Sequence, residues 1–290
     1  MLQAFFISLR PKQWVKNLIL FGPLIFSKNL FALDKTLIAA AAFGLFCLLA
    51  GSVYLINDLL DLERDRRHPV KRLRPLPSGR LSPAVAVVGA ALLAGGSLTA
   101  AFSLERFFGV LALAYFLLNL AYSTGLKHVV IVDVMAIAFG FVLRVLGGAA
   151  VVSVPATPWL LMCTILLALF LGFAKRRHEL TLLSANAEGH RRVLEHYTPY
   201  FLDQMILIVS AATVMSYALY TISPETVQHF GTPNLIYTVP FVLYGIFRYL
   251  YLVHLRAEGG SPTQAFLTDR PLLVNILLWL ISCVLIIERV

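Results

Sequence analysis

The sequence predicts an all-α, polytopic membrane protein, a bundle of nine transmembrane helices. Of its 290 residues, 59% are hydrophobic and 13% are charged, and the mean hydropathy is +0.81, which is more apolar than ordinary soluble domains. Apolar runs of about 17 to 22 residues, enough to cross a roughly 30 Å hydrocarbon layer as helices, recur along the whole chain. The basic residues lie in alternate connections between these runs, next to the membrane, so nucleic acid is a poor candidate partner.

The nine runs follow one another without a soluble stretch long enough for a second domain, so we expect one membrane domain over residues 1–290. Arg10, Lys12 and Lys16 precede the first run, and no small-residue cleavage site follows. We therefore expect a retained helix there and no signal peptide. The runs are centred near residues 24, 46, 92, 115, 140, 166, 211, 243 and 280.

The distribution of Lys and Arg predicts the orientation. With nine spans, the N-terminal segment and the connections after the second, fourth, sixth and eighth spans share one side, which carries 18 of the 24 Lys and Arg residues. Because cytoplasmic loops are enriched in these residues, we expect this side to face the cytoplasm from the cell membrane. The net charge of +9 then describes a basic surface beside anionic lipid.

The second run ends in four side chains that carry oxygen ligands. On a helix these positions fall within an arc of roughly 100°. Carboxylates on one face repel one another unless a cation lies between them, and Mg²⁺ prefers one or two carboxylates together with substrate phosphates. The pattern predicts a site for a Mg²⁺-diphosphate; the alternative is a solvated helix end with ion pairs to Arg64 and Arg66. The four residues are Asn57, Asp58, Asp61 and Asp65.

Two basic stretches accompany this motif. Lys71, Arg72 and Arg74 follow it in a proline-rich segment, where they are candidate phosphate ligands. At the end of the sixth run, Lys175, Arg176 and Glu179 repeat the offsets of Asn57, Asp58 and Asp61 with mostly reversed charge. We interpret the second stretch as a site that binds anions directly, although a basic flank after a membrane helix is the simpler alternative.

Further ionisable residues surround the connection between the fourth and fifth runs. Tyr122 and Lys127 flank that connection, and Asp133 and Arg144 lie in the apolar run that follows. A charged side chain inside a membrane is costly and usually lines a cavity or pairs with another group, so Arg144 binds either a phosphate or a neighbouring helix. We expect Gly147 and Gly148 to permit close helix packing.

The segment YLINDLLDLERD contains NDxxDxxxD, and in this motif and its nine helices the chain resembles the UbiA superfamily of intramembrane prenyltransferases. RPKQWVKN, HPVKRLRPLPSG, YSTGLKH, FVLRVLGG and AKRRHEL are similar to the decaprenyl-phosphate phosphoribosyltransferase branch. Most superfamily members carry a second Asp-rich motif where this chain has only Glu179 among basic residues. That departure argues against a prenyl diphosphate held between two metal clusters.

The resemblance implies transfer of 5-phosphoribose from phosphoribosyl pyrophosphate to a polyprenyl phosphate of the decaprenyl type, with release of pyrophosphate. It implies that Mg²⁺ on the departing pyrophosphate is held by Asn57, Asp58, Asp61 and Asp65, and that Asp58, Asp61 and Lys175 are catalytic. The acceptor is already an oxyanion, so no general base is required. Which phosphate each basic residue binds stays open. The candidate substrate-binding residues are Lys16, Asn57, Lys71, Arg72, Arg74, Tyr122, Lys127, Arg144, Lys175, Arg176 and Glu179.

Two other functions remain as alternatives. A conventional UbiA enzyme would use the same motif to attach a prenyl chain from prenyl diphosphate to an aromatic acceptor. A transporter or lipid scaffold would spread ionisable residues through the membrane depth, whereas only Asp133, Arg144 and Arg248 lie well inside the apolar runs. The sequence indicates neither the chain length of the lipid nor the oligomeric state.

Overall fold

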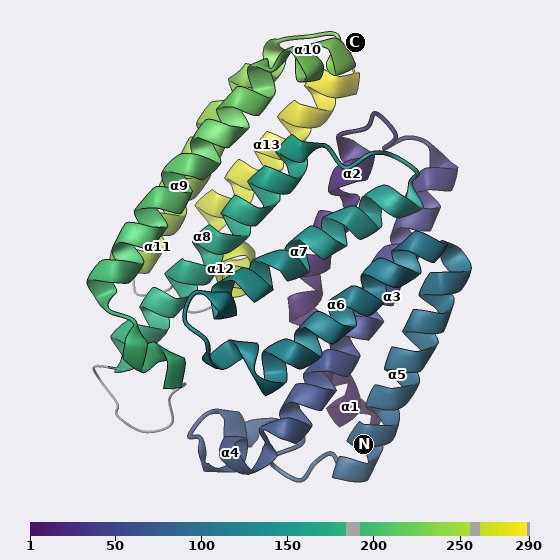
Figure 1. Cartoon of the computed structure of the whole chain (residues 1–290), viewed down its shortest axis with the longest axis vertical. Helices are drawn as coiled ribbons and strands as arrows, with labels where there is room; N and C mark the ends of the chain where they lie inside the picture. The colour runs from purple at the N-terminus through teal and green to yellow at the C-terminus, as the bar shows by residue number, and fades with distance from the viewer. Residues whose placement is uncertain (184–191, 256–261, 289–290) are drawn as a thin grey trace. The chain divides into compact units, whose positions relative to one another are not determined.

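The computed structural model describes residues 1–183, 192–255 and 262–288, and every regular element among them is helical (Figure 1). This confirms the all-α fold. Arg191, Arg256 and Arg289, which contribute to the charge asymmetry, lie outside the described residues. Among the residues that the structure describes, eight helices are long and apolar enough to cross a membrane by length and composition. They are α3 (Leu33–Leu60), α5 (Pro83–Leu104), α6 (Arg106–Thr124), α7 (Val132–Val151), α8 (Pro158–Leu183), α9 (Pro199–Ile222), α11 (Val239–Leu255) with η5 (Asn234–Thr238), and α13 (Arg270–Glu288).

The first of the nine expected spans is not a single long α-helix. The run centred near residue 24 is an 11-residue 3₁₀ segment, η1 (Pro11–Phe21), continued by the short helix α2 (Gly22–Ile25). At about 2.0 Å per residue for a 3₁₀ helix and about 1.5 Å for an α-helix, the two rise roughly 28 Å, close to the membrane thickness. Residues three apart eclipse in a 3₁₀ helix, and Asn17 and Leu20 are the buried pair on one face of η1.

The remaining elements are short; α1 precedes η1, and the others lie between the long helices along the chain. They are α1 (Leu2–Ser8), α4 (Leu62–Arg67), η2 (Lys71–Leu73), η3 (Leu126–His128), η4 (Arg192–His196), α10 (Pro224–Phe230) and α12 (Pro262–Thr268). Several of the long helices begin with proline at the first position, which needs no amide donor there. Ser82 and Thr198 cap two of these helices by accepting hydrogen bonds from Val85 N and Phe201 N.

The chain divides into two units, and the prediction of a single domain over residues 1–290 stays a prediction. The first unit comprises residues 1–136 and 140–156. In it α3 packs against α5, α6 and η1 (Figure 1). The rings of Phe108 and Tyr115 lie 5.6 and 5.3 Å from that of Phe46. A Cβ atom on Gly148 would lie 2.0 Å from the carbonyl oxygen of Leu20, which confirms that this glycine permits close packing of α7 on η1.

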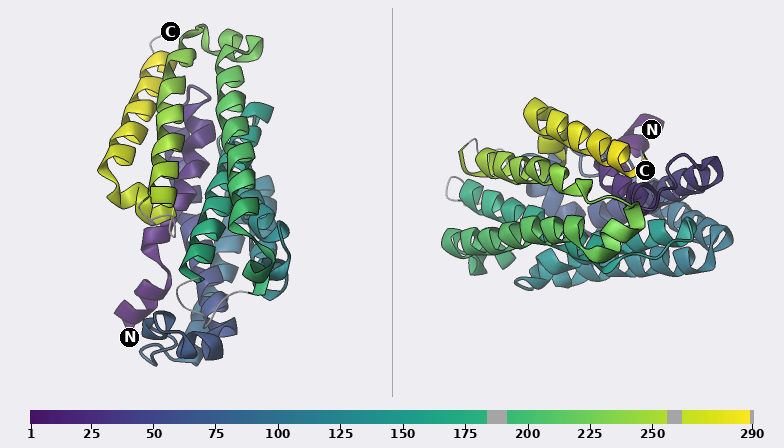
Figure 2. Two further views of the ribbon diagram at one scale, coloured as in Figure 1. Left: turned by 90° about the vertical axis from the view of Figure 1, so that its left-hand side faces the viewer. Right: turned by 90° about the horizontal axis from the view of Figure 1, so that it is seen from above.

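The second unit comprises residues 137–139 and 157–290. In it α8 packs against α9, and α11 lies between α9 and α13 (Figure 2). Trp279 Nε1 donates a hydrogen bond to the hydroxyl of Tyr217, which is 2.7 Å from Thr238 Oγ1. These bonds join α13, α9 and η5 inside the apolar unit, where an unpaired polar group would be costly.

Candidate active site

The acidic motif lies where α3 leaves its apolar stretch. Asp61 ends α3 with φ −95° and ψ 8°, and α4 then continues the chain for six residues. Asp58 and Asp65, on either side of this break, are both buried. Glu63 is exposed and pairs with Arg66 at 2.6 Å, so it lies apart from the other acids. The chain therefore keeps the expected helical placement of the motif with one irregular residue inside it.

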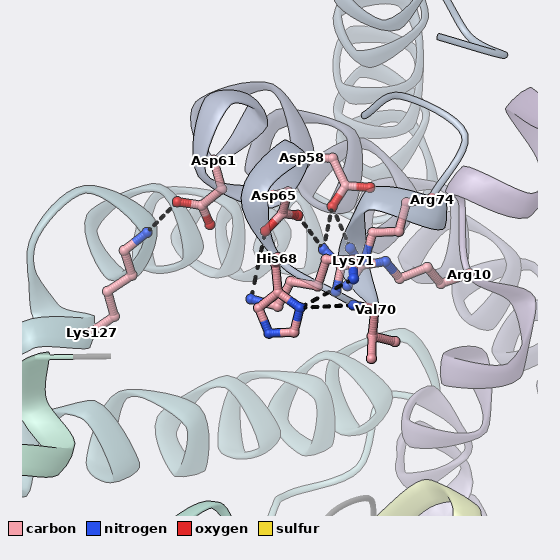
Figure 3. Close-up of polar contacts among 9 residues, drawn as sticks. All are labelled: Arg10, Asp58, Asp61, Asp65, His68, Val70, Lys71, Arg74 and Lys127. Atoms are coloured by element: carbon pink, nitrogen blue, oxygen red, sulfur yellow. Dashed lines mark hydrogen bonds and ion pairs between the residues drawn. The ribbon is translucent and has the colours of Figure 1, made fainter. Parts of the chain in front are cut away.

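Asp58 and Asp65 converge on one guanidinium group (Figure 3). Arg74 Nη1 lies 3.2 Å from Asp58 Oδ1 and 2.6 Å from Asp65 Oδ2. Lys71 Nζ lies 3.6 Å from the other oxygen of Asp65. Lys71 and Arg74 of the basic segment therefore lie against the acids, whereas Arg72 is exposed. The role of these three residues as phosphate ligands stays a prediction.

The segment that carries Arg74 is held by its own packing. His68 Nδ1 accepts hydrogen bonds from the backbone amides of Val70 and Lys71, both at 3.2 Å. After Arg74, Leu76 and Leu81 are almost completely buried in a core cluster of the first unit. The segment is therefore tied down on both sides of Arg74, so its guanidinium is presented to the acids from a fixed backbone.

Asn57 and Asp61 contact residues at and after the end of α6, where the chain connects to α7. Lys127 Nζ, in η3, lies 3.2 Å from Asp61 Oδ1, and Asp61 is the most exposed of the three motif acids at 35%. The hydroxyl of Ser123, near the end of α6, donates to Asn57 Oδ1. The motif thus faces two sets of partners. Asp58 and Asp65 lie toward Arg74 and Asp61 lies toward Lys127 (Figure 3), while Asn57 contacts Ser123 of α6.

Arg10 belongs to this site, although we did not include it among the candidates from the sequence. Its Nη2 pairs with Asp58 Oδ1, and its guanidinium carbon lies 4.8 Å from the ring centroid of Tyr54. The backbone of Arg10 is left-handed, with φ 54° and ψ 62°, a strained conformation for a residue with a side chain and one that is common at functional sites. Its position at the start of RPKQWVKN was the signal that could have identified it.

The donor atoms fit a magnesium ion that is shared with a substrate. Within the described ranges, no group of three or more His, Cys, Asp or Glu side chains is arranged to hold a metal by itself. Asp58 and Asp65 nevertheless offer hard oxygens to one point, now contacted by Arg74 Nη1. Mg²⁺ is usually bound by one or two carboxylates plus substrate phosphates, so this pair suits a metal that arrives with a diphosphate.

Arg144 is engaged by protein groups inside the first unit. Its guanidinium donates to Asn17 Oδ1 at 2.7 Å, to the Gly140 carbonyl at 2.8 Å and to the Tyr115 hydroxyl at 2.8 Å. Asn17 in turn donates to Cys47 Sγ at 3.2 Å. These contacts join α7 to η1 and α6 and favour the interhelical role over the phosphate-binding role for Arg144.

The cationic end of α8 lies in the second unit. Arg176 Nη1 is 2.7 Å from Glu179 Oε2, and Lys175 Nζ is 3.7 Å from Glu179 Oε1. The side chain of Arg176 is buried, whereas that of Lys175 is about one third exposed. Both cations therefore share one carboxylate within a single helix. Of the other predicted ligands, Lys16 and Tyr122 are half-buried in the first unit, and their roles stay predictions.

Comparison with known proteins identifies relatives along nearly the whole chain. A model of the UbiA prenyltransferase family matches residues 18–281. A decaprenyl-phosphate phosphoribosyltransferase from Corynebacterium glutamicum is 35% identical over 96% of this chain and 85% of its own length. The protein of the same name from Mycolicibacterium smegmatis is 33% identical over 94% of this chain and 89% of its own.

Solved structures share the fold. A UbiA homolog from Archaeoglobus fulgidus, bound to GPP and Mg²⁺, superposes with a TM-score of 0.73 over 99% of this chain and 100% of its own, at 18% sequence identity. At this identity the likeness supports the helical architecture alone.

Proposed function

The chain belongs to the UbiA prenyltransferase family, and we propose that this multi-pass membrane transferase moves 5-phosphoribose from phosphoribosyl pyrophosphate to a polyprenyl phosphate. The observation that carries the proposal is its 31–35% identity, over at least 94% of the chain, to relatives named decaprenyl-phosphate phosphoribosyltransferase. In the reaction an oxygen of the lipid phosphate forms a bond to the anomeric carbon as the bond to pyrophosphate breaks. The bonding electrons leave with pyrophosphate, and no proton has to be removed from the acceptor.

The first unit supplies the groups that the donor requires. Asp58 and Asp65, with Asp61 and Asn57 beside them, would hold Mg²⁺, which neutralises charge on the departing pyrophosphate when bound. Arg74 and Lys71 lie against the same acids, where they can also donate to phosphate oxygens. Charge-assisted hydrogen bonds of this kind stabilise a leaving group as its negative charge grows.

The second unit supplies cations without a second acidic motif. Lys175 and Arg176 both pair with the carboxylate of Glu179, and these three side chains together carry one net positive formal charge. We propose that this charge binds a phosphate of the donor or of the lipid. Measuring the KM of Lys175→Ala for each substrate separately assigns the phosphate, because only the substrate that contacts Lys175 should show the rise.

A transfer assay tests the reaction. Purified protein is incubated with Mg²⁺, phosphoribosyl pyrophosphate labelled in the ribose and a long polyprenyl phosphate, and both lipid-linked label and released pyrophosphate are measured. We expect the two products in equal amounts, and neither from Asp58→Ala. Prenyl transfer from a prenyl diphosphate to an aromatic acceptor, with no lipid-linked ribose label, would replace this proposal with the conventional UbiA activity.

We also propose that the site faces the cytoplasm, where a soluble phosphorylated sugar is available, and that the membrane is the cell membrane. Arg67 and Arg106 are exposed residues that the spans assign to opposite sides. With the native cysteines replaced by serine, a membrane-impermeant maleimide should label Arg106→Cys in intact cells and Arg67→Cys only after permeabilisation. The reverse pattern would place the acidic motif on the outer side.

A further inference from the structure

Two buried carboxylates of the site already have a cation between them. The side chains of Asp58 and Asp65 are 3% and 1% exposed, and Arg74 Nη1 contacts an oxygen of each at 3.2 and 2.6 Å. A buried carboxylate without a partner is strongly unfavourable. Arg74 therefore occupies the point between the two acids at which a divalent cation would also bind.

A second arginine strengthens this arrangement. Arg10 pairs with the Asp58 oxygen that Arg74 also contacts, and Lys71 lies 3.6 Å from Asp65. Two negative charges are thus surrounded by three positive ones, so a divalent cation that approached alone would meet net repulsion. Arg10 is held in place by Tyr54, whose ring centroid is 4.8 Å from the guanidinium carbon, a distance typical of a cation–π contact.

A diphosphate changes the balance of charge. It brings several negative oxygens with a metal, and arginine binds phosphate oxygens at least as well as carboxylate oxygens because its planar fork matches both. The acids could then bind the metal while the arginines bind the phosphates, so that no charge in the buried site would lose its partner.

We propose that Arg10 and Arg74 are the counterions of Asp58 and Asp65 before substrate binds. A divalent cation replaces the two arginines only when it binds together with the diphosphate of the donor, and both arginines then bind that diphosphate. This rests on the proposed use of a metal-diphosphate at the acidic motif. Metal and pyrophosphate therefore bind with strong positive coupling, each raising the affinity for the other by the same factor. The two arginines position the metal ligands before binding and the leaving group after it.

The test is a titration with Mn²⁺, followed by electron paramagnetic resonance, and with inorganic pyrophosphate, followed by calorimetry. It compares the unmodified protein with Arg74→Gln. Because the variant removes the cation that competes with the metal, we expect it to bind Mn²⁺ alone about tenfold more tightly, a difference of about 1.4 kcal/mol. It should bind pyrophosphate in the presence of Mn²⁺ about tenfold less tightly, since the phosphates lose their arginine.

Arg66→Gln is the matched control, because Arg66 lies on the same helix as Asp65 but pairs with the exposed Glu63. It should change neither affinity. If Arg74→Gln does not fold, Arg10→Gln should show the same opposite shifts in affinity for Mn²⁺ and for pyrophosphate. Arg10 also pairs with Asp58 but does not belong to the segment that carries Arg74. Unchanged or weaker binding of Mn²⁺ alone in whichever of these variants folds would overturn the proposal.

The titration tests the exchange of counterions and the transfer assay tests the proposed function, so either proposal can be overturned without the other. Mn²⁺ and inorganic pyrophosphate report on the exchange of counterions whichever diphosphate the enzyme uses. Opposite shifts in a protein that transfers no phosphoribose would keep the exchange and overturn the proposed donor. Transfer of phosphoribose without the opposite shifts would keep the function and overturn the exchange.

Discussion

The acidic cluster of the first unit and the cationic end of α8 differ in how they are assembled. The three acids of the cluster are paired with cations from four places in the chain, namely Arg10, Lys71, Arg74 and Lys127. At the end of α8, Lys175 and Arg176 meet Glu179 within one turn of the same helix. Counted over these residues, each group has one net positive formal charge: the acidic cluster has four cations and three acids, and the end of α8 has two cations and one acid.

Equal charge does not give the two groups equal chemistry. Asp58 and Asp65 present oxygens to a shared point and can exchange a cation there. At the end of α8, by contrast, both cations contact the same carboxylate, that of Glu179. The first group therefore suits a metal with its diphosphate, and the second suits a phosphate bound directly. The predictions below test this difference, beginning with the largest expected effect.

Removal of an acid from the first group should abolish turnover. We expect Asp58→Ala and Asp61→Ala each to lower kcat by about 10³-fold or more, roughly 4 kcal/mol in the activation barrier, because a metal ligand for the leaving group is lost. The measurement is the initial rate of lipid-linked label at saturating substrates, with folding checked by size-exclusion chromatography. Near-normal rates in both variants would refute the metal assignment.

The first group also depends on packing far from it. Because a Cβ at position 148 would lie 2.0 Å from a backbone oxygen of η1, Gly148→Ala should force η1, which follows Arg10, away from α7. We expect a loss of about 3 kcal/mol of stability, seen as a lower midpoint of thermal unfolding in detergent. Gly95→Ala is the control, because a Cβ there would have open space around it. Equal midpoints for the two variants would contradict this account of Gly148.

The sequence predicted the helices well, and the contacts within the end of α8 follow from local geometry. Long apolar runs specify membrane helices directly, and the offsets of Lys175, Arg176 and Glu179 lie within one helix, so their meeting follows from helical geometry alone. The acidic motif likewise lies at the end of α3 and the start of α4, although the break at Asp61 divides it between two sets of partners. Within the helices and at the end of α8 the relevant neighbours are close in sequence.

Long-range contacts could not be predicted in this way. Arg10 meets Asp58 across 48 residues, and Arg144 meets Asn17 across 127. Nothing in local spacing specifies such pairs, so Arg10 was missed and Arg144 was left between a phosphate and a neighbouring helix. The 3₁₀ form of η1 was likewise not foreseen, because it involves contacts that its buried residue Asn17 makes with the distant residues Cys47 and Arg144.

Removal of a cation from the second group should weaken binding more than chemistry. Lys175 is about one third exposed and shares its partner with Arg176, so Lys175→Ala leaves the helix intact and removes one charge. We expect KM for one substrate to rise about tenfold, about 1.4 kcal/mol, with kcat changed by less than about threefold. A large fall in kcat at saturating substrates would show that Lys175 acts on the transition state and would make the two groups alike.

The smallest effect should come from an acid beside the first group that is not part of it. Glu63 is two residues from Asp61 and Asp65, but its side chain is 74% exposed and pairs with the exposed Arg66. Exposed ion pairs contribute about 0–1 kcal/mol, so Glu63→Gln should change stability by less than about 0.5 kcal/mol and leave kcat and KM unaltered. The same assay and unfolding measurement apply. If Glu63→Gln were as damaging as Asp61→Ala, the effect of the motif would come from negative charge near the helix end in general. If Glu63→Gln has no effect, the effect of the motif comes from carboxylates that converge on one cation, whereas the ion pairs described at the end of α8 converge on one carboxylate.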